Sequence, residues 1–174
     1  MFIETLADTT IGGVALDDLL RSLMVLAYAG LLVTAAIFDL RRFIIPDSVS
    51  VGLLGLWPFW VVLNGAGPVG FILLGAAIIF VLGIIFFAFG FMGGGDVKLI
   101  TVLALWAEPA GLPLLIFYIS IAGALLSVYW CMPLRRYIAP LIGWTAGLRN
   151  NKQIPYGVAI AVGGLVVAQR HWLG

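Results

Sequence analysis

The sequence predicts an all-α membrane protein, a polytopic bundle of six transmembrane helices with both termini outside. Hydrophobic residues make up 63% of the chain and charged residues 10%, whereas an ordinary soluble domain is about half apolar and about a quarter charged. The apolar residues gather in six runs, and most basic residues lie beside alternate ends of these runs. So much apolar surface needs a bilayer around it. Residues 1–174 are therefore expected to form one integral membrane domain.

The six apolar runs differ in length. They are Leu19–Ile37, Val49–Leu63, Val69–Phe91, Val97–Trp106, Leu112–Met132 and Tyr156–Ala168. The first, third and fifth approach the roughly 20 residues that a spanning helix needs. The fourth is much shorter, since ten helical residues cover only about 15 Å of an apolar layer about 30 Å thick. We expect the fourth helix to lengthen through Glu108 and Pro109 at its outer end.

The distribution of Lys and Arg orients the six runs, because these residues accumulate on cytoplasmic loops. If all six runs cross the membrane and the N-terminus is outside, most basic residues are cytoplasmic, namely Arg41, Arg42, Lys98, Arg135, Arg136, Arg149 and Lys152. If the fourth run only dipped into the membrane and returned, residues 135–152 would lie outside and the asymmetry would be lost. We therefore expect six spans.

The remaining segments are short. Residues 1–18 carry acidic side chains and no basic one, which argues against a signal peptide and predicts an outer interfacial segment. Residues 133–155 form the longest predicted cytoplasmic loop. The single cysteine, Cys131, excludes an internal disulfide framework and a cysteine zinc site. The net charge of +1 gives no reason to expect nucleic acid as a partner.

Three of the eight acidic residues, Asp39, Asp47 and Asp96, fall at predicted cytoplasmic helix ends. Ionisable groups at membrane depth are costly and usually functional. Simpler explanations exist, because Asp47 and Asp96 could cap the helices that follow them. Asp39 lies at a helix C-terminus, where the dipole disfavours an anion. An ion pair with Arg41 or Arg42 could offset that cost.

Three glycines, Gly93 to Gly95, precede Asp96 directly. Each glycine costs a helix about 1 kcal/mol relative to alanine, so we expect a flexible, non-helical stretch here. At membrane depth such backbone is tolerated only where protein or water covers it, and glycine lets a substrate backbone approach closely. Lys98 is either a local counter-ion or a cytoplasmic anchor.

Asp39 and Asp96 have the chemistry of a catalytic pair if the fold brings them together. Two neighbouring carboxyl groups in a partly desolvated site do not both ionise easily, and the pair titrates as a unit. The ionised member takes a proton from water, and the protonated member polarises a peptide carbonyl. This is the arrangement of aspartic proteases.

The polar motifs together resemble the type IV prepilin peptidase family. In chain order they are Asp39, then Ile45-Pro46-Asp47, then Gly93-Gly94-Gly95-Asp96-Val97-Lys98, then Pro155-Tyr156-Gly157. The third element is similar to the family's Gly-x-Gly-Asp signature, and the likeness covers nearly the whole chain. In its short form the sequence resembles the peptidases of tight-adherence (Tad, or Flp) pilus systems.

The resemblance implies roles for these residues. Asp39 and Asp96 would be the catalytic aspartates of an aspartic endopeptidase, and Gly93 and Gly95 the motif glycines, with no cofactor and no metal. The other residues expected to border the site are Asp47, Lys98, Pro155, Tyr156 and Gly157.

The resemblance also implies a substrate and a location. The family's substrates are prepilins, whose basic leader stays cytoplasmic ahead of an apolar helix and is removed after a glycine. The enzyme would be a multi-pass protein of the bacterial inner membrane with its active site on the cytoplasmic side, in contact with lipid and with pilus or secretion assembly machinery. Larger members methylate the new N-terminus and carry two Cys-x-x-Cys pairs, whereas this chain has only Cys131. We expect it to lack the methyltransferase region.

Three alternatives stay open at this point. Membrane carboxylates also serve proton- or cation-coupled transporters, although those sites lie near the midplane and no inverted repeat is visible here. A structural subunit of a secretion machine would tolerate Asp→Asn changes. The oxygen atoms of Asp39, Asp47 and Asp96 would also suit Mg²⁺ or Ca²⁺.

Overall fold

The computed structural model describes residues 10–11, 14–65, 67–131 and 154–173. Its elements in chain order are β1 (Thr10–Ile11), β2 (Val14–Ala15), α2 (Leu16–Arg42), α3 (Asp47–Asn64), α4 (Val69–Ala88), α5 (Gly94–Cys131) and α8 (Tyr156–Leu173). α5 consists of two helical segments, because Glu108 within it has non-helical backbone angles, φ 53° and ψ 167°.

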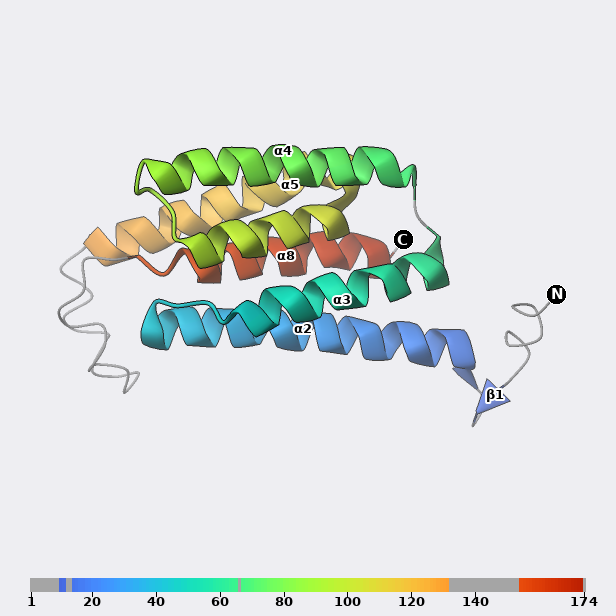
Figure 1. The fold of residues 1–174 in the computed structure, drawn as a ribbon. Coiled ribbons are helices and arrows are strands. Elements are labelled where there is room, and N and C mark those ends of the chain that lie inside the picture. The colour runs from blue at the N-terminus through green and yellow to red at the C-terminus, as the bar shows by residue number, and fades with distance from the viewer. Residues whose placement is uncertain (1–9, 12–13, 66, 132–153, 174) are drawn as a thin grey trace.

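The helices run back and forth along one common direction (Figure 1). The C-terminal ends of α2, α4 and α5 lie at the same end of the bundle as the N-terminal ends of α3, α5 and α8. We call this the site end, because Asp39, Asp47 and Asp96 belong to these helix termini. The alternating course agrees with the apolar runs inferred from the sequence, and the three aspartates come to one end as that alternation predicts.

The bundle has the helices of a membrane protein. In the described part of the chain, four helices are long and apolar enough to cross a membrane, with the two segments of α5 taken as one helix, and α8 contributes a shorter apolar helix, Tyr156–Gln169. These helices make the protein a multi-pass helical membrane protein. The number of spans, six, and the outside location of both termini stay predictions. Most of the predicted interfacial segment, residues 1–18, and most of the predicted loop, residues 133–155, lie outside the described residues.

Several predicted boundaries were wrong. The first helix begins at Leu16 and ends at Arg42, so it is longer at both ends than the apolar run, with Asp17 and Asp18 in its first turn. Before it, β1 and β2 pair in antiparallel fashion, so the prediction of an all-α chain misses this short hairpin. A helix start tolerates acidic residues because its dipole favours them.

The expected lengthening of the fourth helix through Glu108 and Pro109 is also wrong. Glu108 breaks the helix, and Figure 1 shows the second segment of α5 turning back beside the first. The pyrrolidine ring of Pro109 clashes with a helical conformation of the residue before it. The first segment gains its length at the other end instead, where it begins at Gly94.

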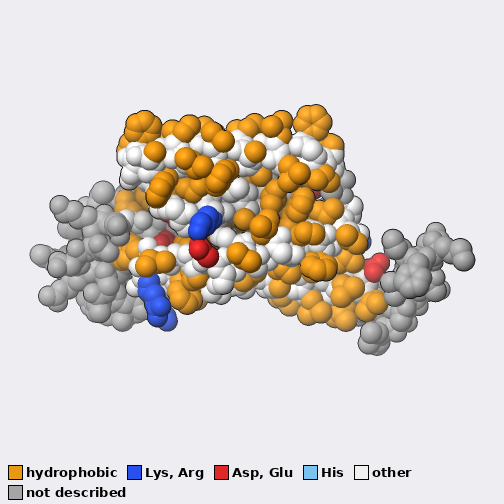
Figure 2. Space-filling model, in the orientation of Figure 1, with side chains coloured by type: hydrophobic (Ala, Val, Ile, Leu, Met, Phe, Trp, Pro, Cys, Tyr) orange, Lys and Arg blue, Asp and Glu red, His pale blue; other side chains and the backbone are white. Residues whose placement is uncertain are grey.

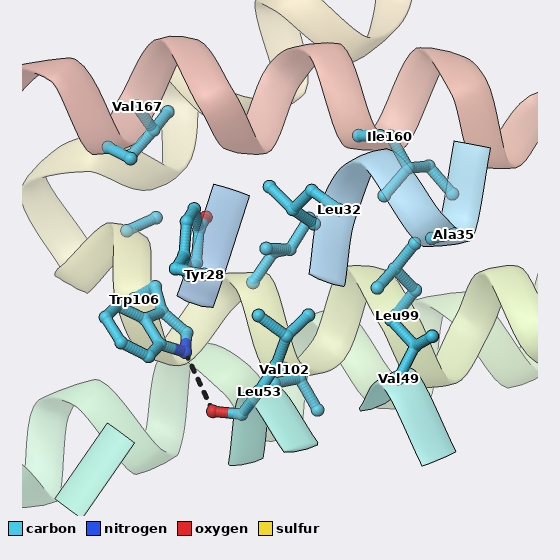
Figure 3. Close-up of a cluster of buried hydrophobic side chains, with 14 of the residues drawn as sticks. Tyr28, Leu32, Ala35, Val49, Leu53, Leu99, Val102, Trp106, Ile160 and Val167 are labelled. Carbon is cyan, nitrogen blue, oxygen red and sulfur yellow. Dashed lines mark hydrogen bonds between the residues drawn. The ribbon is translucent and has the colours of Figure 1, made fainter. Parts of the chain in front are cut away.

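The core lies between α2, α3, α8 and the first segment of α5 (Figure 3). Its labelled side chains are Tyr28, Leu32, Ala35, Val49, Leu53, Leu99, Val102, Trp106, Ile160 and Val167. Aromatic polar groups in this core have backbone partners, since the Trp106 Nε1–H donates to the Leu53 carbonyl (3.1 Å) and the Tyr28 hydroxyl to the Gly164 carbonyl (3.1 Å). These two bonds tie α5 to α3 and α2 to α8, because an unpaired polar group would be costly in this apolar setting.

The outer faces of the helices are apolar. Figure 2 shows hydrophobic side chains covering most of the visible side of the bundle, with few charged ones. Leu26 and Leu125 are each 67% exposed and Val62 is 78% exposed. α4 packs against α5 through Ile72, Ala76 and Ile79 and presents its other faces outward. Such a surface is suited to lipid rather than to water.

The contact of α8 with α5 depends on a glycine. A methyl group at Gly163 would lie 2.5 Å from Cγ1 of Ile119 and 3.3 Å from the Leu115 carbonyl oxygen. We expect Gly163→Ala to destabilise the protein by about 1–3 kcal/mol, the usual cost of overpacking. Gly55→Ala, where a methyl group meets nothing within 4 Å, is the matched control. Thermal unfolding of both variants in detergent tests this, and equal midpoints would contradict the packing described here.

Candidate active site

Asp39 is a buried carboxylate, 5% exposed, in the last turns of α2. Its Oδ2 accepts a hydrogen bond from the backbone N–H of Gly157 at 2.7 Å, across 118 residues of sequence. The backbone N–H of Val158 also bonds to this carboxyl group. Gly157 and Val158 belong to the first turn of α8. Asp39 therefore caps the N-terminus of a helix other than its own.

The capping explains why a carboxylate stands where its own helix dipole disfavours it. The first N–H groups of a helix have no partner within that helix. Pro155, which is fully buried just before α8, has no side-chain oxygen to serve them. The Asp39 carboxylate takes this role and lies at the positive end of the α8 dipole. Arg42, one of the two arginines expected to offset its charge, lies over the Phe38 ring, 5.4 Å from its centroid.

Asp96 also lies at a helix start. Its Oδ2 accepts from the backbone N–H of Gly93 at 3.1 Å, and Gly93 immediately precedes α5. A side chain at the third helical position that bonds back to the residue before the helix is half of a capping box. The capping interpretation of Asp96 is therefore confirmed. It does not exclude catalysis, because the start of α5, which carries Asp96, packs against Ile45, and Ile45 also contacts Gly157, the hydrogen-bond donor to Asp39.

The glycines before Asp96 behave differently from the expectation. Gly94 and Gly95 are helical, so the predicted non-helical stretch is wrong, and the positive φ of this region belongs to Gly90 (74°). Close contacts explain why two of the three residues before Asp96 are glycines. A methyl group at Gly93 would lie 3.0 Å from Oδ2 of Asp96, and one at Gly95 would lie 3.2 Å from Cβ of Ile45. Glycine is used here for space, not for flexibility.

Asp47 and Lys98 form an ion pair at the rim of the site end. The Lys98 Nζ donates to Asp47 Oδ1 at 2.8 Å, and their side chains are 53% and 70% exposed, respectively. The predicted capping of α3 by Asp47 is not observed, since Pro46 occupies the cap position and no side-chain cap bond is formed. Lys98 is a counter-ion, but its partner is Asp47 rather than Asp96. The pair joins the start of α3 to the start of α5.

Because this pair is exposed, its contribution should be small. Exposed ion pairs are worth about 0–1 kcal/mol, so we expect Asp47→Asn and Lys98→Gln each to leave folding intact and to lower activity only slightly. The measurement is prepilin cleavage by the purified variants under identical conditions. A loss as large as that expected for Asp39→Asn or Asp96→Asn would place Asp47 or Lys98 in the chemistry itself.

The structure brings together Asp39, Asp96, Gly95 and Gly157, and it adds Ile45. Ile45 is buried, 6% exposed, and touches both Gly95 and Gly157. In the sequence, Ile45 stands out only as the first residue of the Ile45-Pro46-Asp47 motif. Ile45 directly precedes Pro46 in the link between α2 and α3, which is so short that its residues must lie close to the helix ends. This position could have identified Ile45 as a site residue from the sequence. The Tyr156 ring lies against Gly123 instead, on the second segment of α5.

The three aspartates have separate hydrogen-bond partners. Within the described part of the chain, no group of three or more His, Cys, Asp or Glu residues could hold a metal ion. Asp47 is turned to Lys98, while Asp39 and Asp96 accept backbone N–H groups. The divalent-cation alternative therefore has no support in the geometry of these residues.

Comparison with known proteins assigns the chain to a family. The model of the type IV leader peptidase family matches residues 26–128, more than half of the chain and the part that contains Asp39, Asp47 and Asp96. The chain belongs to the type IV leader peptidase family. The residues from Pro155 to Gly157 lie beyond the matched region.

Two relatives carry the name prepilin leader peptidase/N-methyltransferase. They come from Aeromonas salmonicida, one of them from strain A449, and each is 28% identical over 152 residues. The match covers 83% of this chain and 48% of each relative. The chain thus spans about half the length of the curated relatives it matches. No solved structure matches it significantly.

Proposed function

We propose that this chain is a membrane aspartyl endopeptidase that removes the leader peptide of type IV or Flp-like prepilins at the cytoplasmic membrane face. The observation that carries the proposal is the arrangement of Asp39 and Asp96. The two carboxylates lie at one end of an apolar bundle, each is held by a backbone N–H at a helix start, and Ile45 packs against both of these helix starts. Membership in the leader peptidase family supports the same reaction.

The proposed chemistry uses the pair with one proton between them. The ionised carboxylate removes a proton from water, and the protonated carboxyl group donates to the carbonyl oxygen of the scissile peptide. The water oxygen bonds to the carbonyl carbon, the C–N bond then breaks, and the nitrogen leaves with a proton from the pair. The N–H groups of Gly157 and Gly93 hold the two side chains still during these transfers.

The location of the pair matches the proposed substrate. A prepilin presents its cleavage site where a basic leader joins an apolar helix, so the scissile bond lies near the cytoplasmic membrane edge. Asp39 and Asp96 lie at the end of the bundle, beside faces that suit lipid. A transporter would place its carboxylates near the middle of the membrane, and so the observed location favours the peptidase.

The direct test is incubation of the purified protein with a full-length Flp-type prepilin in detergent, followed by intact-mass measurement. The expected product is the prepilin without its leader, unmethylated even when S-adenosylmethionine is present. A soluble leader peptide without the apolar helix should be a poor substrate, because it loses the binding that positions the bond. The control is an active prepilin peptidase that cleaves the same prepilin in the same detergent. If this protein leaves that prepilin uncleaved, the proposal is overturned.

The orientation of the bundle can be tested on a single helix. Ser48 and Asn64 are exposed residues at opposite ends of α3. On a background lacking Cys131, a cysteine at position 64 should react with a membrane-impermeant reagent added outside intact cells, and a cysteine at position 48 should react only after permeabilisation. The reverse pattern would place the site end outside and contradict the proposed location.

A further inference from the structure

Ile45 lies where three parts of the candidate site meet. It belongs to the link between α2 and α3, and its side chain is 6% exposed. Its neighbour Ile44 has the same side chain and is 67% exposed. The link therefore buries one isoleucine selectively, between the helix starts that hold the two aspartates.

The first contact of Ile45 is with the start of α5. A methyl group on Gly95 would lie 3.2 Å from Cβ of Ile45, 3.5 Å from its carbonyl oxygen and 3.6 Å from its nitrogen. The backbone of Ile45 thus packs directly on the residue that precedes Asp96. Because backbone cannot rotate away as a side chain end does, this contact fixes how closely α5 approaches the link.

The second contact is with the start of α8. A methyl group on Gly157 would lie 2.7 Å from Cδ1 of Ile45 and 2.8 Å from Oδ2 of Asp39. Gly157 therefore touches both the end of the Ile45 side chain and the carboxylate to which it donates its N–H. Any movement of the Gly157 backbone toward Ile45 or away from it changes this hydrogen bond.

We infer that Ile45 is a positioning residue that sets the placement of Asp39 relative to Asp96, acting through Gly157 on one side and Gly95 on the other. The inference rests on the proposed peptidase function. Ile45 takes no part in proton transfer. Its Cδ1 methyl group supports Gly157, whose N–H orients Asp39, while its backbone supports Gly95 and the helix start that carries Asp96.

The first experiment compares two changes that are chemically identical. Ile45→Val removes only Cδ1 and keeps the contact with Gly95, and Ile44→Val removes the same atom from an exposed side chain. We expect Ile45→Val to lower kcat about tenfold with little change in KM, since a displacement of about 1 Å can cost about a hundredfold. Ile44→Val should match the unchanged protein. Equal kcat values for the two variants would overturn the inference.

A double variant tests whether the effect passes through Gly157. Gly157→Ala alone should nearly abolish cleavage, because its methyl group collides with both Ile45 and Asp39. In Ile45→Val with Gly157→Ala, loss of Cδ1 removes the collision with Ile45 and gives the Gly157 backbone room to move away from Asp39, so the double variant should be more active than Gly157→Ala but less active than the unchanged protein. Contacting residues are expected to be coupled in this way. If the fold-losses in kcat of the two single variants simply multiply in the double variant, Ile45 and Gly157 are not coupled and this route through Gly157 is contradicted.

A measurement that needs no substrate, infrared spectroscopy of the Asp39 carboxyl group, tests this inference independently of the proposed peptidase function. The infrared carboxyl band of Asp39 is the one missing in Asp39→Asn. Ile45→Val should shift this band because the hydrogen bond from Gly157 changes, while Ile44→Val should leave it in place. If the protein cleaves no prepilin but the band shifts, the positioning inference stands and the proposed function fails. An unshifted band in Ile45→Val overturns the inference whatever the activity.

Discussion

Asp39→Asn and Asp96→Asn should each abolish prepilin cleavage while leaving the protein folded in the membrane. Asparagine has nearly the same size as aspartate, and its side-chain oxygen can still accept the N–H of Gly157 or Gly93. What each change removes is the ability to take up or release a proton. General acid–base catalysis is typically worth about 10²–10⁴-fold, so we expect losses of at least about a hundredfold.

The matched control for the dyad is Asp18→Asn. Asp18 lies in the first turn of α2, at the opposite end of the bundle from the site. Cleavage of a prepilin, measured by intact mass over time, should be unchanged in this variant. A near-normal rate in either Asp39→Asn or Asp96→Asn would show that the proposed pair is not the catalytic one. Comparable loss in all three variants would indicate a general effect of removing charge.

Gly157→Ala should be nearly as damaging as loss of an aspartate, although it adds a single methyl group. That methyl group would lie 2.8 Å from Oδ2 and 3.0 Å from Cγ of Asp39. One of the partners must move, and the hydrogen bond from Gly157 to Asp39 moves with it. Misplacement of a catalytic group by about 1 Å can cost about a hundredfold in rate, so we expect kcat to fall by about that factor.

The control for Gly157→Ala is Gly30→Ala, a helical glycine whose added methyl group meets nothing within 4 Å. Alanine favours a helix by about 1 kcal/mol over glycine, so this variant should be at least as stable as the unchanged protein and fully active. Gly157→Ala should also retain its helical circular dichroism. Normal activity of Gly157→Ala would mean that the contact between Gly157 and Asp39 is not needed for cleavage.

The helical class and the polar end of the bundle could be predicted from the sequence. Apolar runs separated by turns imply helices of alternating direction, and that alternation places Asp39, Asp47 and Asp96 at one end. The motif around Asp96 pointed to the same family that the comparison with known proteins confirms. The break at Glu108 was not predicted, because we expected the fourth helix to continue through Glu108 and Pro109.

The partners of the site residues could not be predicted. Asp39 bonds to Gly157 over 118 residues, and Lys98 to Asp47 over 51 residues. From the sequence, Arg41 and Arg42 were the expected partners of Asp39, and no pairing of Asp47 with Lys98 was predicted. Which side chains and backbone groups become hydrogen-bond partners depends on how each helix is rotated about its axis. In a soluble helix the apolar stripe reveals that rotation.

In this chain the pattern of apolar residues says little about how each helix is rotated, because the lipid-facing and core-facing sides of the helices are both apolar. α4 exposes Phe71, Leu73 and Ile78 outward and buries Ile72 and Ile79, with no polar face to distinguish the two. The apolar runs and the positions of the acidic residues are enough to predict a helical membrane protein with carboxylates at one end. The backbone groups that hold those carboxylates, and the place of Ile45 between them, are visible only once the helices are packed, because close packing of small residues, rather than polarity, sets the contacts between these helices.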